Sequence, residues 1–174
     1  AFSYNHLVDM TMVPSEALRG QILANHRIRP EGIRVVYPGI AFEVIKAAEA
    51  TLLPSELMSW LASHPGPLLA HIAMLRGEKG HLFLLEVINN LRARFPQIRC
   101  VMAGEGEMHF SVEKRIQELG LTEHVYLAGM VSKVAPLIRH ADVVVLPSTM
   151  EPLGMAQIEA LALEVPVVAN RVDG

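Results

Sequence analysis

The segment DVVVLPSTMEPLGMAQIEALALEVPVVA, residues 142–169, indicates the fold class of this chain. Two short apolar runs rich in valine flank a longer stretch that follows Pro152, which is the pattern of a strand, a helix and a second strand. Both apolar runs are nearly continuous, as expected of parallel strands covered on both faces. The segment therefore predicts a βαβ unit in which a short loop joins the first strand to the helix.

The same alternation runs through most of the chain. We predict strands at residues 34–37, 68–74, 98–103, 124–128, 142–146 and 165–169. We predict helices at residues 15–25, 56–62, 81–94, 107–119, 131–140 and 153–163. The predicted fold is α/β, a Rossmann-like parallel sheet with helices on both faces. We expect residues 1–30 to be the tail of a preceding domain or a linker, and residues 31–174 to be a domain that is incomplete at its C-terminus.

Composition excludes several classes of function. The chain has 174 residues, 51% of them hydrophobic, and a formal net charge of -3, with no basic stripe and few aromatic residues for nucleic-acid binding. Its single cysteine, Cys100, lies in an apolar run and is expected to be a buried thiol in a reducing, cytoplasmic compartment. Its eight histidines lack the spacing of a zinc site, and no apolar run is long enough to span a bilayer.

Glu159 is the charge that the helical pattern does not explain. At about 100° per residue, the apolar arc of the helix that contains Met155 includes Ile158 and Leu161, and Glu159 falls inside this arc. A carboxylate that faces a core is costly unless it is hydrogen-bonded or paired. Its partner is expected to be either a ligand or another side chain.

Glu151 stands just before the same helix. Pro152 favours an extended conformation at Glu151 and suits the first helical position, so Glu151 is expected beside the free amides of the first turn, which attract anions. Glu151 and Glu159 are then at least roughly 12 Å apart along the helix axis, about the span from the sugar to the ribose of a nucleotide sugar. For Glu151 alone, the alternative is a carboxylate at the helix start that the helix dipole favours, which is a common arrangement.

Three further loops follow predicted strands, where open parallel sheets bind ligands. Arg76-Gly-Glu-Lys79-Gly80 offers two cations and two glycines before a helix, a seat for a diphosphate or simply a solvated turn. Gly104-Glu-Gly106 permits a tight turn, but His109 stands where a dinucleotide site needs a third glycine, so an NAD site is not supported. Gly129-Met130-Val131 offers backbone groups to a base edge, or a plain turn.

Together these segments resemble the C-terminal, donor-binding half of retaining glycosyltransferases of the GT-B fold, family 4 (group 1). Ala141–Ser148 followed by Glu151–Ala160 resembles the family's E-x7-E element. Ala73–His81 resembles its phosphate-binding loop, and Val101–Gly106 its Gly-x-Gly turn. The family often has Gly-Arg where this chain has Ala73-Met74, so Arg76 takes over the role of that cation or the loop binds phosphate less tightly.

The resemblance implies a role for each matching residue. It implies catalytic roles for Glu151, which would bind hydroxyls of the donor sugar, and for Lys79 and Arg76, which would contact the diphosphate. Glu159 would bind the ribose. The other implied substrate-binding residues are Gly104, Gly106, Gly129, Met130, Val131, Leu153, Gly154 and Met155.

The resemblance also implies partners and activity. The donor would be a UDP-, GDP- or ADP-linked sugar, transferred by a hexosyltransferase-type reaction without a metal ion or other cofactor. The acceptor, a glycan or lipid-linked glycan, would bind to an N-terminal domain outside this chain, so the 174 residues alone are expected to be inactive. The full-length protein is expected in the cytoplasm, with peripheral association at the inner face of the membrane as an option. The alternatives are a sugar-nucleotide epimerase of the same fold and a non-catalytic nucleotide-sugar binding module.

Overall fold

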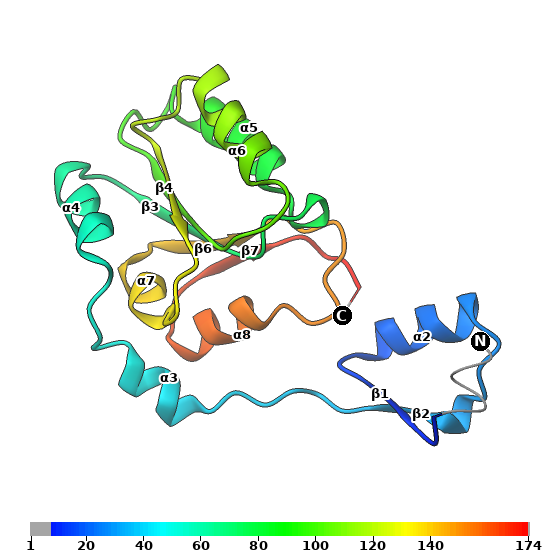
Figure 1. Ribbon diagram of the computed structural model, residues 1–174. Helices are drawn as coiled ribbons and strands as arrows, with labels where there is room; N and C mark the ends of the chain where they lie inside the picture. Colours follow the sequence, from blue (N-terminus) through cyan, green and yellow to red (C-terminus); the bar gives the residue numbers. More distant parts are fainter. Residues whose placement is uncertain (1–7, 174) are drawn as a thin grey trace. The chain divides into compact units, whose positions relative to one another are not determined.

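The computed structural model describes residues 8–173, which form two compact units (Figure 1). The first unit comprises the described residues up to Ile40, the short segment Met150–Gly154 and residues 171–173. The second comprises Ala41–Thr149 and Met155–Asn170. The division thus differs from the predicted domain ranges, because residues 31–40 group with the first unit.

The second unit is built on a five-stranded parallel sheet. Its strands lie in the order β5-β4-β3-β6-β7, and every neighbouring pair is parallel. Five of the six predicted strands are therefore confirmed in this sheet. Their nearly continuous apolar residues suit a sheet that is buried on both faces. Their bounds are Leu68–Ile72 for β3, Arg99–Ala103 for β4, Val125–Gly129 for β5, Val143–Leu146 for β6 and Val167–Ala169 for β7.

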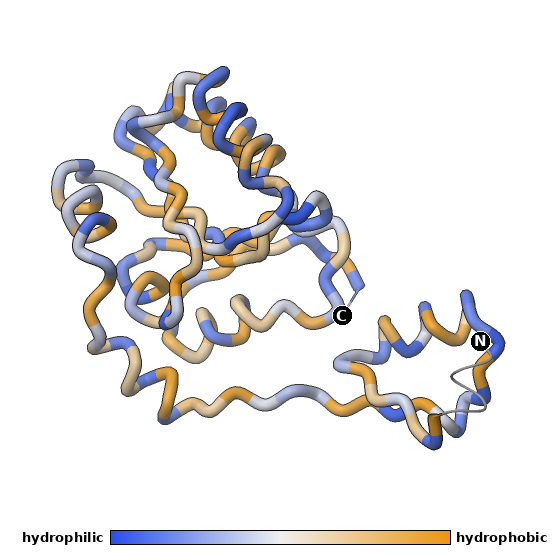
Figure 2. Tube along the Cα trace, viewed as in Figure 1, coloured by the Kyte–Doolittle hydropathy of each residue, from blue (hydrophilic) through white to orange (hydrophobic). Residues whose placement is uncertain are grey.

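Helices cover both faces of this sheet, and each face has its own hydrophobic core. On one face lie α5 (His81–Leu91) and α6 (His109–Glu118), with Cys100 buried beneath them. The predicted burial of Cys100 is confirmed, and burial raises the pKa of its thiol. Figure 2 shows blue, hydrophilic segments mixed with orange ones along α5 and α6, as expected of helices with one buried face.

The opposite face carries four helices. They are α3 (Phe42–Ala48), α4 (Ser55–Ser63), α7 (Ala135–His140) and α8 (Met155–Ala162). Leu57 of α4, Leu137 of α7 and Ala160 of α8 are buried together in one core cluster. The structure therefore confirms the α/β Rossmann-like fold.

The first unit contains a βαβ element of its own. β1 (Thr11–Val13) pairs in parallel with β2 (Ile33–Val35), and α2 (Glu16–Asn25) and the 3₁₀ turn η1 (Pro30–Gly32) connect them. The hydroxyl of Ser15 accepts a hydrogen bond from the amide of Leu18 at 3.2 Å and so caps the start of α2, which confirms the helix predicted from residue 15. The strand predicted at residues 34–37 was wrongly placed in the main sheet, since β2 pairs with β1 instead.

Three helices of the second unit, α6, α7 and α8, begin later than predicted. α8 begins at Met155 rather than at residue 153, because Gly154 has φ +73°, which a right-handed helix does not allow. Pro152 therefore lies in the loop. α7 begins at Ala135 rather than at residue 131, which places Pro136 in the first turn, where a proline is tolerated. No helix within residues 8–173 is long and apolar enough to cross a lipid bilayer.

Candidate functional site

The loops that carry the predicted site in the second unit follow neighbouring strands. Because all five strands are parallel, the loops after β3, β4, β5 and β6 leave the same edge of the sheet. The loop after β3 lies between the loops after β4 and β6, since β3 pairs with both strands. This edge is where an open α/β sheet binds its ligands.

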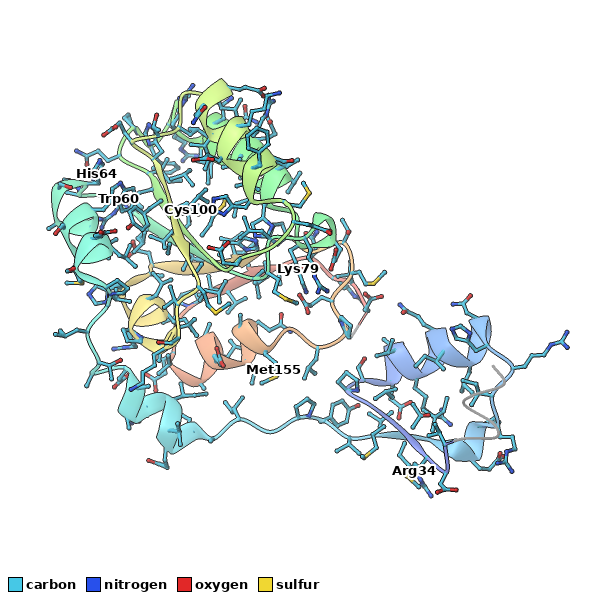
Figure 3. The ribbon with its side chains drawn as sticks, viewed as in Figure 1. Arg34, Trp60, His64, Lys79, Cys100 and Met155 are labelled. Atoms are coloured by element: carbon cyan, nitrogen blue, oxygen red, sulfur yellow. The ribbon has the colours of Figure 1, made fainter. Side chains whose placement is uncertain are left out.

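The loop after β3 brings the two predicted cations to the start of α5. Arg76 is exposed and Lys79 is half-buried in the 3₁₀ turn η2 (Gly77–Lys79), which Gly80 joins to α5 in the left-handed conformation. Figure 3 shows Lys79 beside the turn that leads into α5. The first-turn amides of an α-helix lack intrahelical acceptors and attract anions. The loop can therefore offer both side-chain and backbone donors to a diphosphate.

Two glycines of the next loop allow it to lie against the β3 loop. The amide of Leu75 donates to the carbonyl of Glu105 at 3.0 Å, and the amide of Met108 donates to the carbonyl of Leu75 at 2.9 Å. A Cβ atom at Gly104 would lie 2.0 Å from the carbonyl oxygen of Ala73, and one at Gly106 would lie 2.5 Å from that of Leu75. Gly104 and Gly106 thus have a packing role, whereas their predicted contact with the donor stays a prediction.

The other side of the β3 loop is held by the loop after β6. The amide of Thr149 donates to the carbonyl of Glu78 at 2.8 Å. A Cβ atom at Gly80 would lie 2.3 Å from the carbonyl oxygen of Pro147, so only glycine fits this contact. The cationic loop is therefore fixed from both sides by backbone contacts, which suits a rigid anion site.

A pair of buried histidines lies beneath the cationic loop. His71 of β3 and His81 of α5 are 0% and 3% exposed, and their ring centroids are 4.4 Å apart at an interplanar angle of 68°. Nδ1 of His71 lies 2.7 Å from the carbonyl oxygen of Val145 and donates to it. Burial lowers the pKa of His71 to about 3 and is the main cause of this shift. Burial also lowers the pKa of His81.

We expect acid to destabilise the protein through His71. Its folded pKa of about 3 lies below the usual value of an unfolded histidine, so below about pH 6.5 the unfolded state binds the extra proton. From pH 7 to pH 5 this histidine alone should lower the free energy of unfolding by about 2 kcal/mol. Urea denaturation of the wild type and of His71→Gln at both pH values tests this, and the variant should show the smaller loss. Equal losses in both proteins would rule out His71 as the source.

The loop after β5 borders a cavity at the same edge. Gly129 has φ +61°, and its carbonyl accepts a hydrogen bond from the amide of Gly104 at 2.8 Å. The following residues Met130 and Val131 line a cavity of about 280 Å³ that also reaches Gly104. The structure thus brings the predicted base-binding loop and part of the Gly-x-Gly turn together. The other lining residues are Ile72, Ala73, Met74, Ala103, Glu105 and Val134.

Glu159 faces a second cavity, of about 210 Å³. The cavity is mostly apolar and lies among α3, α8 and the segment before α7, and Lys133 also lines it. Among residues 8–173, the Glu159 carboxylate has no hydrogen bond or ion pair with another side chain, and burial raises its pKa. The prediction of a charge turned toward apolar surroundings is confirmed. Leu161, expected on the same face, is instead 64% exposed.

Not all predicted site residues belong to this unit. Glu151, Leu153 and Gly154 group with the first unit, where the amide of Glu151 donates to the Asp173 carboxylate at 2.8 Å. Asp173 also accepts a hydrogen bond from the side-chain amide of Gln21 at 2.6 Å. Met155, labelled in Figure 3, belongs by contrast to the second unit as the first residue of α8. It is 39% exposed. The second unit thus collects Lys79, Arg76, Glu159 and the glycine-rich turns.

Sequence reasoning missed two features of the site. Lys133 borders the Glu159 cavity and also a third cavity, of about 530 Å³, which is lined by residues 51–54 and 130–133. His81 was treated as one of many scattered histidines, although its place directly after Lys79-Gly80 was a signal. Within the described residues, no group of three histidine, cysteine or acidic side chains could hold a metal ion.

Comparison with known proteins establishes the family. The family model for glycosyl transferases group 1 matches residues 58–174. The chain belongs to this family. This group 1 chain is 28% identical over 137 residues to alpha-D-kanosaminyltransferase from Streptomyces kanamyceticus, covering 78% of this chain and 36% of that protein. It is also 28% identical over 173 residues to D-inositol 3-phosphate glycosyltransferase from Mycobacterium leprae, covering 95% of this chain and 39% of that protein.

Solved structures agree on the fold. Anabaena Alr3699/HepE in complex with UDP-glucose has a TM-score of 0.83 at 23% identity, covering 98% of this chain and 47% of that one. A glycosyltransferase from Rickettsia africae has a TM-score of 0.79 at 23% identity, covering 99% and 48%. These likenesses place the group 1 chain among GT-B folds. The chain spans less than half the length of each of these relatives.

Proposed function

We propose that the protein contributes the donor-binding part of a family 4 glycosyltransferase, which transfers a sugar from a nucleotide diphosphate with retention of anomeric configuration. The observation that carries this proposal is the half-buried carboxylate of Glu159, which has no side-chain partner among residues 8–173 and lies beside a cavity in the unit that also presents Arg76 and Lys79. A carboxylate kept in apolar surroundings without a protein partner suits hydroxyl groups of a ligand. The relative crystallised with UDP-glucose supports a nucleotide sugar as that ligand.

The proposed donor lies along the edge of the sheet. The base occupies the cavity bordered by Met130 and Val131, and the ribose hydroxyls donate to Glu159. The diphosphate binds at the β3 loop, where Lys79 and Arg76 precede the first turn of α5. Glu151 binds hydroxyls of the transferred sugar. The acceptor, a glycan or lipid-linked glycan, binds to a part of the enzyme outside this chain.

The proposed catalysis is electrostatic and needs no metal ion. Transfer breaks the bond between the anomeric carbon and a diphosphate oxygen, so negative charge develops on the diphosphate. Two cationic side chains and the amides at the start of α5 stabilise that charge. Because the backbone contacts of Glu78 and Leu75 hold this loop in place, little reorganisation accompanies the reaction. Full activity in the presence of a chelator is the expected result.

We expect Glu159→Gln to weaken donor binding about tenfold or more. The substitution removes the charge but keeps the shape, so hydrogen bonds from ribose hydroxyls to a carboxylate are replaced by weaker neutral ones. Calorimetry with UDP, GDP and ADP measures the change in Kd. Glu113→Gln, an exposed substitution on α6, should leave Kd unchanged. Unchanged affinity in Glu159→Gln would remove Glu159 from the donor site.

Two other functions fit the same cavities and can be separated by assay. A sugar-nucleotide epimerase would convert the donor without any acceptor, so product analysis with donor alone identifies it. A non-catalytic module would bind the nucleotide sugar, yet the whole protein would transfer nothing. The group 1 membership favours transfer over both.

A further inference from the structure

We propose that His81 is a positioning residue, which holds the cationic loop in the shape that receives the diphosphate. The inference rests on the proposed function, because it concerns the same diphosphate site. His81 is the first residue of α5, directly after Lys79-Gly80, and its side chain is almost fully buried. It therefore acts from beneath the loop and does not touch the ligand.

The hydrogen bonds of His81 close the loop on itself. Its imidazole is hydrogen-bonded to the carbonyl groups of Arg76 and Ala73, while its Nδ1 has no partner within residues 8–173. Nε2 therefore carries the proton and donates to both carbonyls, and the ring is neutral. Because Ala73 begins the loop and Arg76 carries its first cation, one ring ties these two points to the start of α5.

The carbonyl of Arg76 is the centre of this arrangement. It accepts a second hydrogen bond from the amide of Lys79 at 3.1 Å. The backbone of both cationic residues and the ring of His81 therefore meet at one carbonyl group. The backbone hydrogen bonds from the neighbouring loops are made to Leu75 and Glu78, on either side of Arg76. Without the imidazole, the Arg76 carbonyl keeps the hydrogen bond from the Lys79 amide but loses the one from His81, so the Arg76 peptide is held less firmly and the orientation of the Arg76 side chain changes.

His71 keeps the His81 ring in place. Its Nδ1 donates to the carbonyl of Val145 in β6, which fixes its tautomer, and its ring meets the His81 ring edge-on. Both rings are held neutral by burial. His81 therefore adds no charge to the site, and its contribution to diphosphate binding is geometric.

Three variants test this role. His81→Phe keeps the ring but removes the donor, and His81→Gln restores an amide donor of similar reach. The control is His124→Phe, which removes the 2.7 Å contact between Nδ1 of His124 and the carbonyl of Ile98 at the opposite edge of the sheet. Calorimetry measures Kd for UDP, GDP and ADP and for the matching monophosphates, which lack the second phosphate.

We expect His81→Phe to raise Kd for the nucleoside diphosphate about tenfold, because the loss of its hydrogen bonds to the Arg76 and Ala73 carbonyls leaves the cationic loop less well positioned. The monophosphate should lose clearly less, and His81→Gln and His124→Phe should stay near the wild type. If His81→Phe does not fold, His81→Asn, whose side chain is shorter than the imidazole, replaces it. Unchanged diphosphate affinity, or equal losses for both nucleotides, would overturn the positioning role alone. A wild type that binds no nucleoside diphosphate would instead reject the proposed function, and this inference with it.

Discussion

Lys79→Ala is expected to lower sugar transfer by the whole enzyme about 100-fold or more. Lys79 lies in the turn that leads into α5, so its ammonium group can meet the diphosphate where negative charge develops during transfer. Loss of one electrostatic contact of this kind typically costs 10²- to 10³-fold in turnover. Glu151→Ala should cause a loss of similar size, because its carboxylate is proposed to hold the transferred sugar. Steady-state kinetics with saturating donor measure both.

Two controls separate charge at the site from charge elsewhere. Lys114→Ala removes an exposed cation of α6 whose ion pair with Glu118 spans 3.6 Å, and a surface pair of this kind contributes little. Glu56→Ala removes an exposed carboxylate in the first turn of α4. Both controls should retain near-normal turnover. Near-normal turnover of Lys79→Ala and Glu151→Ala as well would defeat the proposed mechanism.

The main sheet could be predicted from sequence because its strands are buried on both faces. Runs such as Val143–Leu146 are continuous in apolar residues, which is the pattern of a strand covered on both faces. β1 was missed because Thr11–Val13 is too short to show any period. Its partner β2 was found but assigned to the wrong sheet, since a residue pattern does not state which strand lies alongside.

The start of α8 was predicted two residues too early, because Pro152 was interpreted as a signal for the start of the helix. Pro152 suits the first turn of a helix but equally suits a loop, and the left-handed Gly154 decides for the loop. The Glu159 prediction succeeded because a charge among apolar positions is visible in the spacing alone. The sequence pattern did not predict the exposure of Leu161. The helix α8 has only eight residues and buries Ala160 instead.

The contacts that shape the loops could not be predicted, because they are made by the backbone. His81 donates to two carbonyl groups, and the sequence does not show where a carbonyl points. Gly104 and Gly106 were explained by the approach of a ligand, whereas the atoms that approach them most closely belong to Ala73 and Leu75. A glycine that admits a ligand and one that admits another loop have the same sequence pattern.

Gly104→Ala distinguishes these two roles through stability. Gly104 has φ +145°, and a Cβ atom there would lie 2.0 Å from the carbonyl oxygen of Ala73, a backbone atom that cannot rotate away. Strain of the left-handed conformation and overpacking each cost roughly 1–3 kcal/mol, so the free energy of unfolding should fall by about 3 kcal/mol or more. Urea denaturation at pH 7 without any nucleotide measures the loss.

Gly77→Ala is the matched control for this prediction. Gly77 lies in the neighbouring β3 loop, and nothing lies within 4 Å of the position that its Cβ atom would take. Its free energy of unfolding should change by no more than about 0.5 kcal/mol. If Gly104 served only the approach of a ligand, both variants would be equally stable and only nucleotide binding would differ. A large loss confined to Gly104→Ala means that the glycine holds the β3 and β4 loops together, and that any effect on the donor follows from the displaced cationic loop.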